Sequence, residues 1–224
     1  MIPWKQLDST DIPNDGGQLR LFQRDDEFSI RIDNCELMNS RAHGSEEKLA
    51  EWGCATLNRL EAPRVLIGGL GMGFTAAAAL LQLGSNAQVV IAELLPAVVR
   101  WNREFLGHLA GQPLQDPRTQ IRETDVAALI KTSPRMFDAI LLDVDNGPDG
   151  LTQKENDWLY SDAGLKSSYQ ALKSGGVLAV WSAGPSTAFT NRLHKAGFKV
   201  REEQTRARGK GKGSRHTIWL GTRK

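Results

Sequence analysis

The chain has 224 residues, of which 40% are hydrophobic and 24% charged; this suits one globular α/β domain with at most a short appendage and excludes disordered, collagenous and low-complexity fibrous proteins. The formal net charge of +2 identifies no class of partner by itself. That total conceals a split, because residues 191–224 carry eleven Lys or Arg and two acids, whereas residues 1–190 carry 17 basic and 24 acidic side chains.

Residues 1–44 predict a small N-terminal β appendage. Apolar and polar residues alternate over residues 19–22 and 28–32, and Asp25–Glu27 provides a turn between these two runs. A third short apolar run follows at residues 36–38. We therefore expect a β-hairpin and one further short strand ahead of the main domain.

A helix is expected next, with Ser45 as its N-cap and Glu46 and Glu47 in its first turn. From Pro63 onward, short apolar strands alternate with helices, which is the pattern of a parallel sheet covered on both faces. For residues 45–224 we predict an α/β fold: a doubly wound, mostly parallel sheet of seven strands, ending in an antiparallel pair. The expected strands are residues 65–67, 89–92, 119–121, 139–142, 177–180, 199–205 and 216–221, and the expected helices are residues 74–83, 96–109, 125–131, 163–172 and 185–195.

A glycine-rich turn, Gly68–Gly73, follows the first of these strands and opens a helix. Parallel sheets bind ligands at such strand ends, and glycine permits a positive φ and a close approach of the ligand to the backbone. Gly69, Gly71 and Gly73 are therefore candidate nucleotide-binding residues. The alternative is a tight strand-to-helix turn that merely needs small residues.

Three acids stand at the ends of further strands of the predicted sheet. Glu93, 20 residues after Gly73, is placed to accept the hydroxyls of a ribose, unless it is a solvated charge at a strand end. Asp125 is placed to contact an adenine amine, or to cap the helix that it precedes. Asp143 ends the most apolar strand, so its carboxylate is expected in the same crevice.

Five segments of the chain resemble, in order and spacing, the motifs of the spermidine/spermine synthase family. The resemblance implies a class I methyltransferase fold, which is Rossmann-like, with a small N-terminal β appendage. It also implies a ligand of the adenosyl-thioether type. The segments are residues 65–73, 92–94, 116–118, 124–125 and 138–148.

The resemblance also implies a role for each candidate residue. Glu93 would bind the ribose and Asp125 the adenine of S-adenosylmethionine or its decarboxylated form, bound as cosubstrate. The three loop glycines would face the amino-acid or aminopropyl end. Asp143 would be the acid nearest the reacting amine, with Asp145 as the second acid of the motif.

Two motifs depart from the family pattern. Polyamine synthases have an Asp, two small residues and then Asp-Pro, whereas Asp143–Pro148 reads Asp-Val-Asp-Asn-Gly-Pro, so that the second acid is displaced by one position. The family's Tyr-His-Glu at the end of the appendage is missing, and the nearest equivalent is Gly44–Glu47. Aminopropyl transfer to a polyamine-like amine is the leading hypothesis, and methyl transfer from intact S-adenosylmethionine is the alternative.

The charge split bears on the partners of the chain. Six acids and one lysine lie between residues 143 and 162, which favours a small cationic amine as acceptor. The basic loop Arg206–Arg215 is the one hint of nucleic acid; it lacks aromatic residues for base stacking, so nucleic acid is not expected. A non-catalytic nucleoside- or RNA-binding protein that uses this loop is the third hypothesis. The family and the exposed strand edges imply a homodimer.

No feature of the sequence indicates a membrane or a metal. Cys35 and Cys54 are too few for a disulfide framework, and we expect both to be small buried residues. The N-terminus shows no secretory signal, and the longest apolar stretch, residues 74–83, is far shorter than the ~18 residues that span a bilayer. The four histidines have no ligand spacing. We expect a soluble cytoplasmic protein without a metal.

Overall fold

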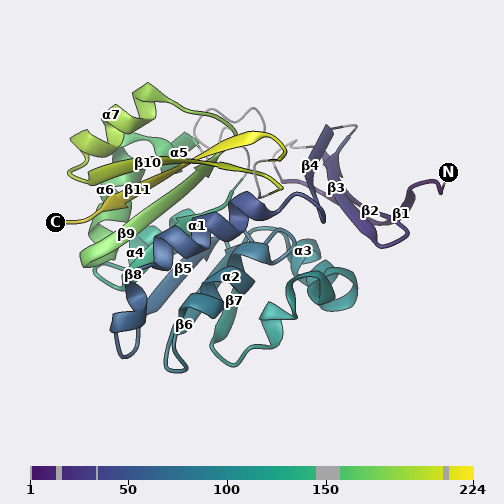
Figure 1. The fold of residues 1–224 in the computed structure, drawn as a ribbon, viewed down its shortest axis with the longest axis horizontal. Helices are drawn as coiled ribbons and strands as arrows, with labels where there is room; N and C mark the ends of the chain where they lie inside the picture. The colour runs from purple at the N-terminus through teal and green to yellow at the C-terminus, as the bar shows by residue number, and fades with distance from the viewer. Residues whose placement is uncertain (1, 14–16, 34, 145–156, 209–211) are drawn as a thin grey trace.

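The structure, a computed structural model, describes residues 2–13, 17–33, 35–144, 157–208 and 212–224. It contains two sheets: an N-terminal antiparallel sheet of four strands and a mixed sheet of seven strands with helices on both faces (Figure 1). The seven-stranded sheet confirms the predicted doubly wound, mostly parallel α/β fold. The division into an appendage and a larger domain after residue 44 remains a prediction.

The seven-stranded sheet has five parallel strands and an antiparallel pair at one edge. The C-terminal hairpin forms that pair, because β11 is antiparallel to both β9 and β10. This confirms the hairpin expected from the tail. In spatial order the strands are β10 (Lys199–Arg206), β11 (Arg215–Thr222), β9 (Leu172–Ser182), β8 (Phe137–Leu142), β5 (Arg64–Gly68), β6 (Gln88–Glu93) and β7 (Thr119–Glu123).

The central strands are apolar on both faces because helices cover both. Successive residues of a strand point to opposite faces; Val65 and Ile67 of β5 therefore pack with one set of helices and Leu66 packs with the other. The first set is α1 (Gly44–Cys54), α2 (Phe74–Gln82) and α3 (Pro96–Trp101), and the second is α4 (Val126–Thr132), α5 (Asp157–Tyr160), α6 (Asp162–Ala171) and α7 (Thr187–Lys195).

The N-terminal sheet packs one apolar face against the first set of helices. Leu19, Leu21, Phe28 and Ile30 are buried on that face and belong to the same core as α1 to α3. The strand β1 was not predicted, because its sequence KQLDSTD is mostly polar and exposed or half-buried. The four strands are β1 (Lys5–Asp11), β2 (Gln18–Arg24), β3 (Glu27–Ile32) and β4 (Cys35–Asn39).

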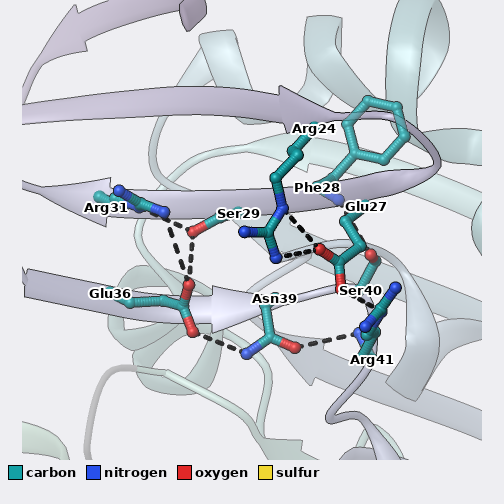
Figure 2. Close-up of polar contacts among 9 residues, drawn as sticks. All are labelled: Arg24, Glu27, Phe28, Ser29, Arg31, Glu36, Asn39, Ser40 and Arg41. Atoms are coloured by element: carbon teal, nitrogen blue, oxygen red, sulfur yellow. Dashed lines mark hydrogen bonds and ion pairs between the residues drawn. The ribbon is translucent and has the colours of Figure 1, made fainter. Parts of the chain in front are cut away.

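Polar side chains of β2 to β4 and the residues after β4 form a hydrogen-bonded network (Figure 2). Glu27 pairs with both Arg24 and Arg41. Glu36 accepts hydrogen bonds from the Ser29 hydroxyl at 2.8 Å and the Asn39 amide at 2.7 Å. The network ties the short edge strand β4 to its neighbours, and Leu37 and Met38 of this strand contribute to the cavity described below.

One asparagine links the region after β6 to the glycine turn. The expected helix over residues 96–109 is divided into α3, a π-helical turn at Asn102–Leu106 and a 3₁₀ turn at Gly107–Ala110. Asn102 is buried, and its Nδ2 donates to the carbonyl oxygens of Gly71 at 2.8 Å and Val98 at 3.0 Å. The hydrophobic periodicity of residues 96–109 did not predict this interruption of the helix. The interruption coincides with a tertiary contact, the one between Asn102 and the glycine turn.

Two smaller expectations were wrong. Ser45 is not an N-cap: α1 begins at Gly44, and Ser45 lies buried within its first turn, where its hydroxyl bonds to side chains. Cys54 is buried as expected, and burial raises the pKa of its thiol to about 12; Cys35 is exposed because it begins the edge strand β4.

In the ranges that the structure describes, no helix is both long and apolar enough to cross a bilayer.

Candidate active site

A cavity of about 130 Å³, partly open to solvent, lies between the two sheets. Gly69, Gly71, Glu93, Asp125 and Asp143 all line it. The structure therefore brings together five of the residues that the sequence singled out. Two others behave differently: Gly73 forms the N-cap of α2 rather than the lining, and Asp145 lies outside the described residues.

The polar lining comes from a row of neighbouring strand ends. Across the sheet the order is β8, β5, β6 and β7, and the residues at or after their carboxyl ends are Asp143, Gly69, Glu93 and Asp125 respectively. The carboxyl ends of parallel strands lie at the same edge of the sheet, so these four residues, spread over 75 residues of sequence, line one crevice.

The glycine turn needs its glycines for two different reasons. Gly69, Gly71 and Gly73 all have positive φ, at 87°, 51° and 87°, a region that other residues rarely adopt. Gly69 also lies against Asp143, because a β-carbon there would be 2.4 Å from the Asp143 backbone oxygen. Gly71 lies under Met38 of β4, whose sulfur would be 3.2 Å from an added β-carbon.

Glu93 is held rigidly at the centre of the cavity lining. Its Oε2 accepts the backbone N–H of Leu70 and its Oε1 accepts that of Leu95, both at 2.9 Å. The side chain is thus locked between the glycine turn and the residues after β6, and only 7% of the residue is exposed. Carboxylate oxygens accept more than one hydrogen bond each, so both can still bind hydroxyl groups of a ligand. The structure excludes the alternative of a solvated strand-end charge.

Asp125 caps a helix and also lines the cavity. Its Oδ1 accepts the backbone N–H of Ala127 at 2.8 Å, which makes it the N-cap of α4. The residue is exposed and lines the cavity together with Thr124 and Val126. Since one oxygen suffices for the cap, capping and ligand contact are compatible.

Asp143 lies where the cavity meets a smaller hollow. Its Oδ2 accepts a short hydrogen bond from the Thr75 hydroxyl of α2. Burial raises the pKa of Asp143 to about 6, while the bond from Thr75 acts in the opposite direction. A carboxyl group with such a pKa can both hold and release a proton near neutral pH.

The roof of the cavity is apolar and comes from the N-terminal sheet. A water-poor lining of this kind, opposite a few fixed polar groups, is typical of sites that bind an organic ligand. Asp8 of β1 ties this sheet to α3, since its Oδ2 accepts from Arg100 at 2.6 Å and from Trp101 Nε1 at 2.7 Å. The roof residues are Ile12, Leu19, Ile30, Ile32, Leu37 and Met38.

Sequence reasoning missed two residues of the smaller hollow, Thr75 and Glu46. Burial, together with the nearby charge of Asp143, raises the pKa of Glu46 to about 7. The sequence assigned Glu46 to the first turn of a helix, where acids are common, within the nearest equivalent of the missing Tyr-His-Glu motif. It did not indicate that this turn faces the end of β8. Across the described parts of the chain, no three His, Cys, Asp or Glu side chains are grouped to hold a metal ion.

Comparisons with known proteins agree with this geometry. Residues 43–193 match the spermine/spermidine synthase domain. Comparison with curated protein sequences gives no match. A spermidine synthase solved with the transition-state analogue AdoDATO shares the fold with a TM-score of 0.76 and 18% identity, over 98% of this chain and 72% of that one.

Two further solved structures resemble the chain. The spermidine synthase of Thermotoga maritima has a TM-score of 0.77 and 18% identity, over 98% of this chain and 73% of that one. A probable spermidine synthase of Corynebacterium glutamicum has a TM-score of 0.68 and 14% identity, over 97% of this chain and 79% of that one. At these identities the likeness demonstrates a shared fold.

Proposed function

The chain belongs to the spermine/spermidine synthase family and is an enzyme of the aminopropyltransferase type; on that premise we propose that it transfers an aminopropyl group from decarboxylated S-adenosylmethionine to a small cationic amine. The observation that carries the proposal is the row of Asp143, Gly69, Glu93 and Asp125 along one cavity. This row offers acceptors for a nucleoside at one end and a proton acceptor at the other.

The residues present fit a donor of the adenosyl-sulfonium type. Glu93 would accept the two ribose hydroxyls, since backbone amides already fix its carboxylate. Asp125 would accept a hydrogen bond from the adenine amine. Gly69 and Gly71 line the cavity, so the alkyl groups on sulfur would lie against the glycine turn, between it and the apolar roof.

The protein contributes alignment, exclusion of water and removal of a proton. A bound sulfonium supplies a leaving group that is already activated. The acceptor must approach as a neutral amine, so Asp143 would first bind its ammonium form and then take one proton. The raised pKa of Asp143 suits this task, because a carboxylate of ordinary pKa is a weaker base.

Calorimetry with three ligands tests the proposal. We expect decarboxylated S-adenosylmethionine and methylthioadenosine to bind, and an added diamine to gain one aminopropyl group, detected by mass spectrometry. Methyl transfer from intact S-adenosylmethionine instead would replace the proposed reaction with the alternative one. If none of the three ligands binds, both reactions are excluded.

We further propose that the enzyme is cytoplasmic and forms a homodimer through the N-terminal sheet. Strands β1 and β4 are the edges of that sheet, and edge strands present backbone groups that can pair with another chain. Sedimentation velocity tests the dimer; a monomer at all concentrations would contradict it.

The role of Asp145 as a second acid stays a prediction. So does the expectation of no nucleic-acid binding, because part of the basic loop Arg206–Arg215 lies outside the described residues.

A further inference from the structure

Two carboxyl groups from distant parts of the chain face the smaller hollow beside the cofactor cavity. Asp143 follows β8, Glu46 belongs to α1, and both line this hollow. Met38, Gly71 and Asp143 line both spaces, so a molecule in the hollow has access to the glycine turn. The remaining walls suit the methylene chain of an alkyl amine; they include Leu70, Met72 and Phe74.

Each carboxyl group has its own hydroxyl donor. The Thr75 hydroxyl donates to Oδ2 of Asp143, and the Ser45 hydroxyl donates to Oε2 of Glu46 at 2.6 Å. Thr75 also lies 3.5 Å from the Glu46 carbonyl oxygen, which joins α1 and α2 at this point. The two acids are therefore held independently beside the same space, Asp143 by a hydroxyl of α2 and Glu46 by a hydroxyl of α1.

We propose that Glu46 is a second acid–base residue of the active site, which receives from Asp143 the proton released by the acceptor amine. The inference rests on the proposed function and deepens it. Glu46 comes from a part of the chain where the family motif is replaced, so this role belongs to the residues of this chain and was not carried over from the family.

The proton and electron balance of the step is complete. The ammonium of the acceptor gives one proton to the Asp143 carboxylate, which passes it to Glu46. The freed nitrogen lone pair forms a bond to the methylene carbon of the aminopropyl group, while the carbon–sulfur bond breaks and its electron pair stays on sulfur. The products are a neutral thioether, a secondary ammonium and one proton held by the two carboxyl groups.

The electrostatics of the hollow support sharing of a proton. Burial raises the pKa of Asp143 to about 6, and burial with the Asp143 charge raises the pKa of Glu46 to about 7. Among the described residues, the charge of Glu47, on the same helix, also raises the pKa of Glu46, and His216 reaches Glu46 through Ser45. Near neutral pH the pair thus carries one charge and part of a second, which suits a cationic acceptor.

His216 of β11 positions Glu46 through Ser45. Its Nδ1 lies 2.8 Å from the Ser45 oxygen, and its ring packs edge-on against Trp181 with 4.7 Å between ring centres. Burial lowers the pKa of His216, so its imidazole is neutral at pH 7. Because the single hydroxyl proton of Ser45 goes to Glu46, Nδ1 is the donor to Ser45. Glu46 therefore ends a chain of two donors that begins in the C-terminal hairpin.

Infrared titration of the full-length protein tests the shared proton without any substrate. We expect a protonated-carboxyl signal that titrates with a midpoint near pH 7 and disappears in Glu46→Gln. The control is Glu51→Gln, which removes a carboxylate of the same helix that is 40% exposed and paired with Lys48; this variant should keep the signal. A wild-type protein without the signal overturns the inference, whatever its activity.

Kinetics with decarboxylated S-adenosylmethionine and a diamine test the role in the reaction. Glu46→Gln should lower kcat/KM by about 10²-fold or more and move the acidic limb of the pH profile to lower pH, because only Asp143 then has to ionise. Glu51→Gln should leave both unchanged. Equal rates and pH profiles in Glu46→Gln and the wild type would overturn the role of Glu46.

The positioning role of His216 is tested by two substitutions. His216→Asn keeps a donor near the position of Nδ1, and His216→Leu removes it. We expect the leucine variant to lose kcat with little change in KM for the donor, and the asparagine variant to recover most of it. Equal losses in both variants would exclude the hydrogen-bonded chain. In every variant, methylthioadenosine binding reports separately on the proposed function; if the wild type does not bind it, the proposed function fails and the infrared result still stands.

Discussion

Gly69 and Asp143 are in backbone contact, since a β-carbon on Gly69 would lie 2.4 Å from the carbonyl oxygen of Asp143. The Asp143 N–H also donates to the Gly68 carbonyl oxygen at 3.0 Å. The glycine turn after β5 and the acid after β8 therefore form one continuous surface under the proposed donor, and a change in one displaces the other.

Substitution of Gly69 by alanine tests this contact. The residue has a φ of 87°, so Gly69→Ala combines backbone strain of about 1–3 kcal/mol with displacement of the strand end at Asp143. We expect methylthioadenosine affinity, measured by calorimetry, to fall by at least ~10-fold. Gly84→Ala is the control, because an added β-carbon there meets nothing within 4 Å. Unchanged affinity in Gly69→Ala would show that the turn does not contact the nucleoside.

Substitution of Glu93 by glutamine should remove ribose recognition. A side-chain amide carries only one oxygen, so it cannot accept both backbone N–H groups that now fix the carboxylate. Loss of charged hydrogen bonds worth about 1.5–3 kcal/mol should weaken methylthioadenosine binding by ~10- to 100-fold. Binding of free adenine should change little, which separates ribose contacts from a general collapse of the site.

Glu123→Gln, on the neighbouring strand of the sheet, is the control for Glu93→Gln. Glu123 pairs with Glu93 across β6 and β7 but is exposed. Glu123→Gln should bind methylthioadenosine as the wild type does. Comparable losses in both variants would indicate that the net charge of this edge, rather than ribose recognition by Glu93, controls affinity.

Substitution of Asp143 by asparagine should stop turnover and spare donor binding. The amide retains an oxygen for the Thr75 hydroxyl but cannot take a proton from the amine. We expect kcat to fall by ~10²- to 10⁴-fold, measured by product mass, with methylthioadenosine affinity within a few-fold of the wild type. Asp162→Asn, on an exposed carboxylate paired with Lys195, serves as the control. Undiminished turnover in Asp143→Asn would assign the proton transfer elsewhere.

The raised pKa values of the two acids also predict how stability depends on pH. A carboxyl group with a raised pKa in the folded state binds its proton more tightly there than in the unfolded chain, so it contributes stability at low pH that is lost as pH rises. With folded-state values of about 6 for Asp143 and about 7 for Glu46, this loss should span about pH 4 to 7.

Urea unfolding at several pH values measures this effect. Glu46→Gln should be more stable than the wild type above about pH 7, by on the order of 1–2 kcal/mol, and the difference should shrink near about pH 5. Glu51→Gln should follow the wild-type curve throughout. A constant difference between Glu46→Gln and the wild type at all pH values would mean that Glu46 titrates normally.

The sequence predicted those parts of the site that depend on strand ends. Glu93, Asp125 and the glycine turn lie at or just after the carboxyl ends of strands, and in a parallel sheet such positions meet at one edge. The same local reasoning failed for β1, whose polar sequence shows no alternation, and for the interruption at Asn102. Those features depend on contacts with the first helices and the glycine turn.

Glu46 and Ser45 show most clearly which parts of the site the sequence could not predict. An acid and a serine at a helix start are common as a cap and its neighbour, and the resemblance marked Gly44–Glu47 as the nearest equivalent of a missing motif without assigning a role to either residue. Ser45 bonds to His216, 171 residues away, and Glu46 shares the smaller hollow with Asp143, 97 residues away. Only the packing of α1 beside β8 and β11 brings these groups together, and no local pattern encodes that packing.

The contact of Asp8 with Arg100 and Trp101 fastens the roof of the cavity to α3. Among the described residues, no strand pairing joins the four-stranded sheet to the seven-stranded sheet (Figure 1), so side-chain packing and contacts such as this one hold the roof in place. The space left for an acceptor amine therefore depends on side chains that pack between the two sheets. Substitution of Asp8, which does not line the cavity, is thus a route by which this enzyme's acceptor range can change.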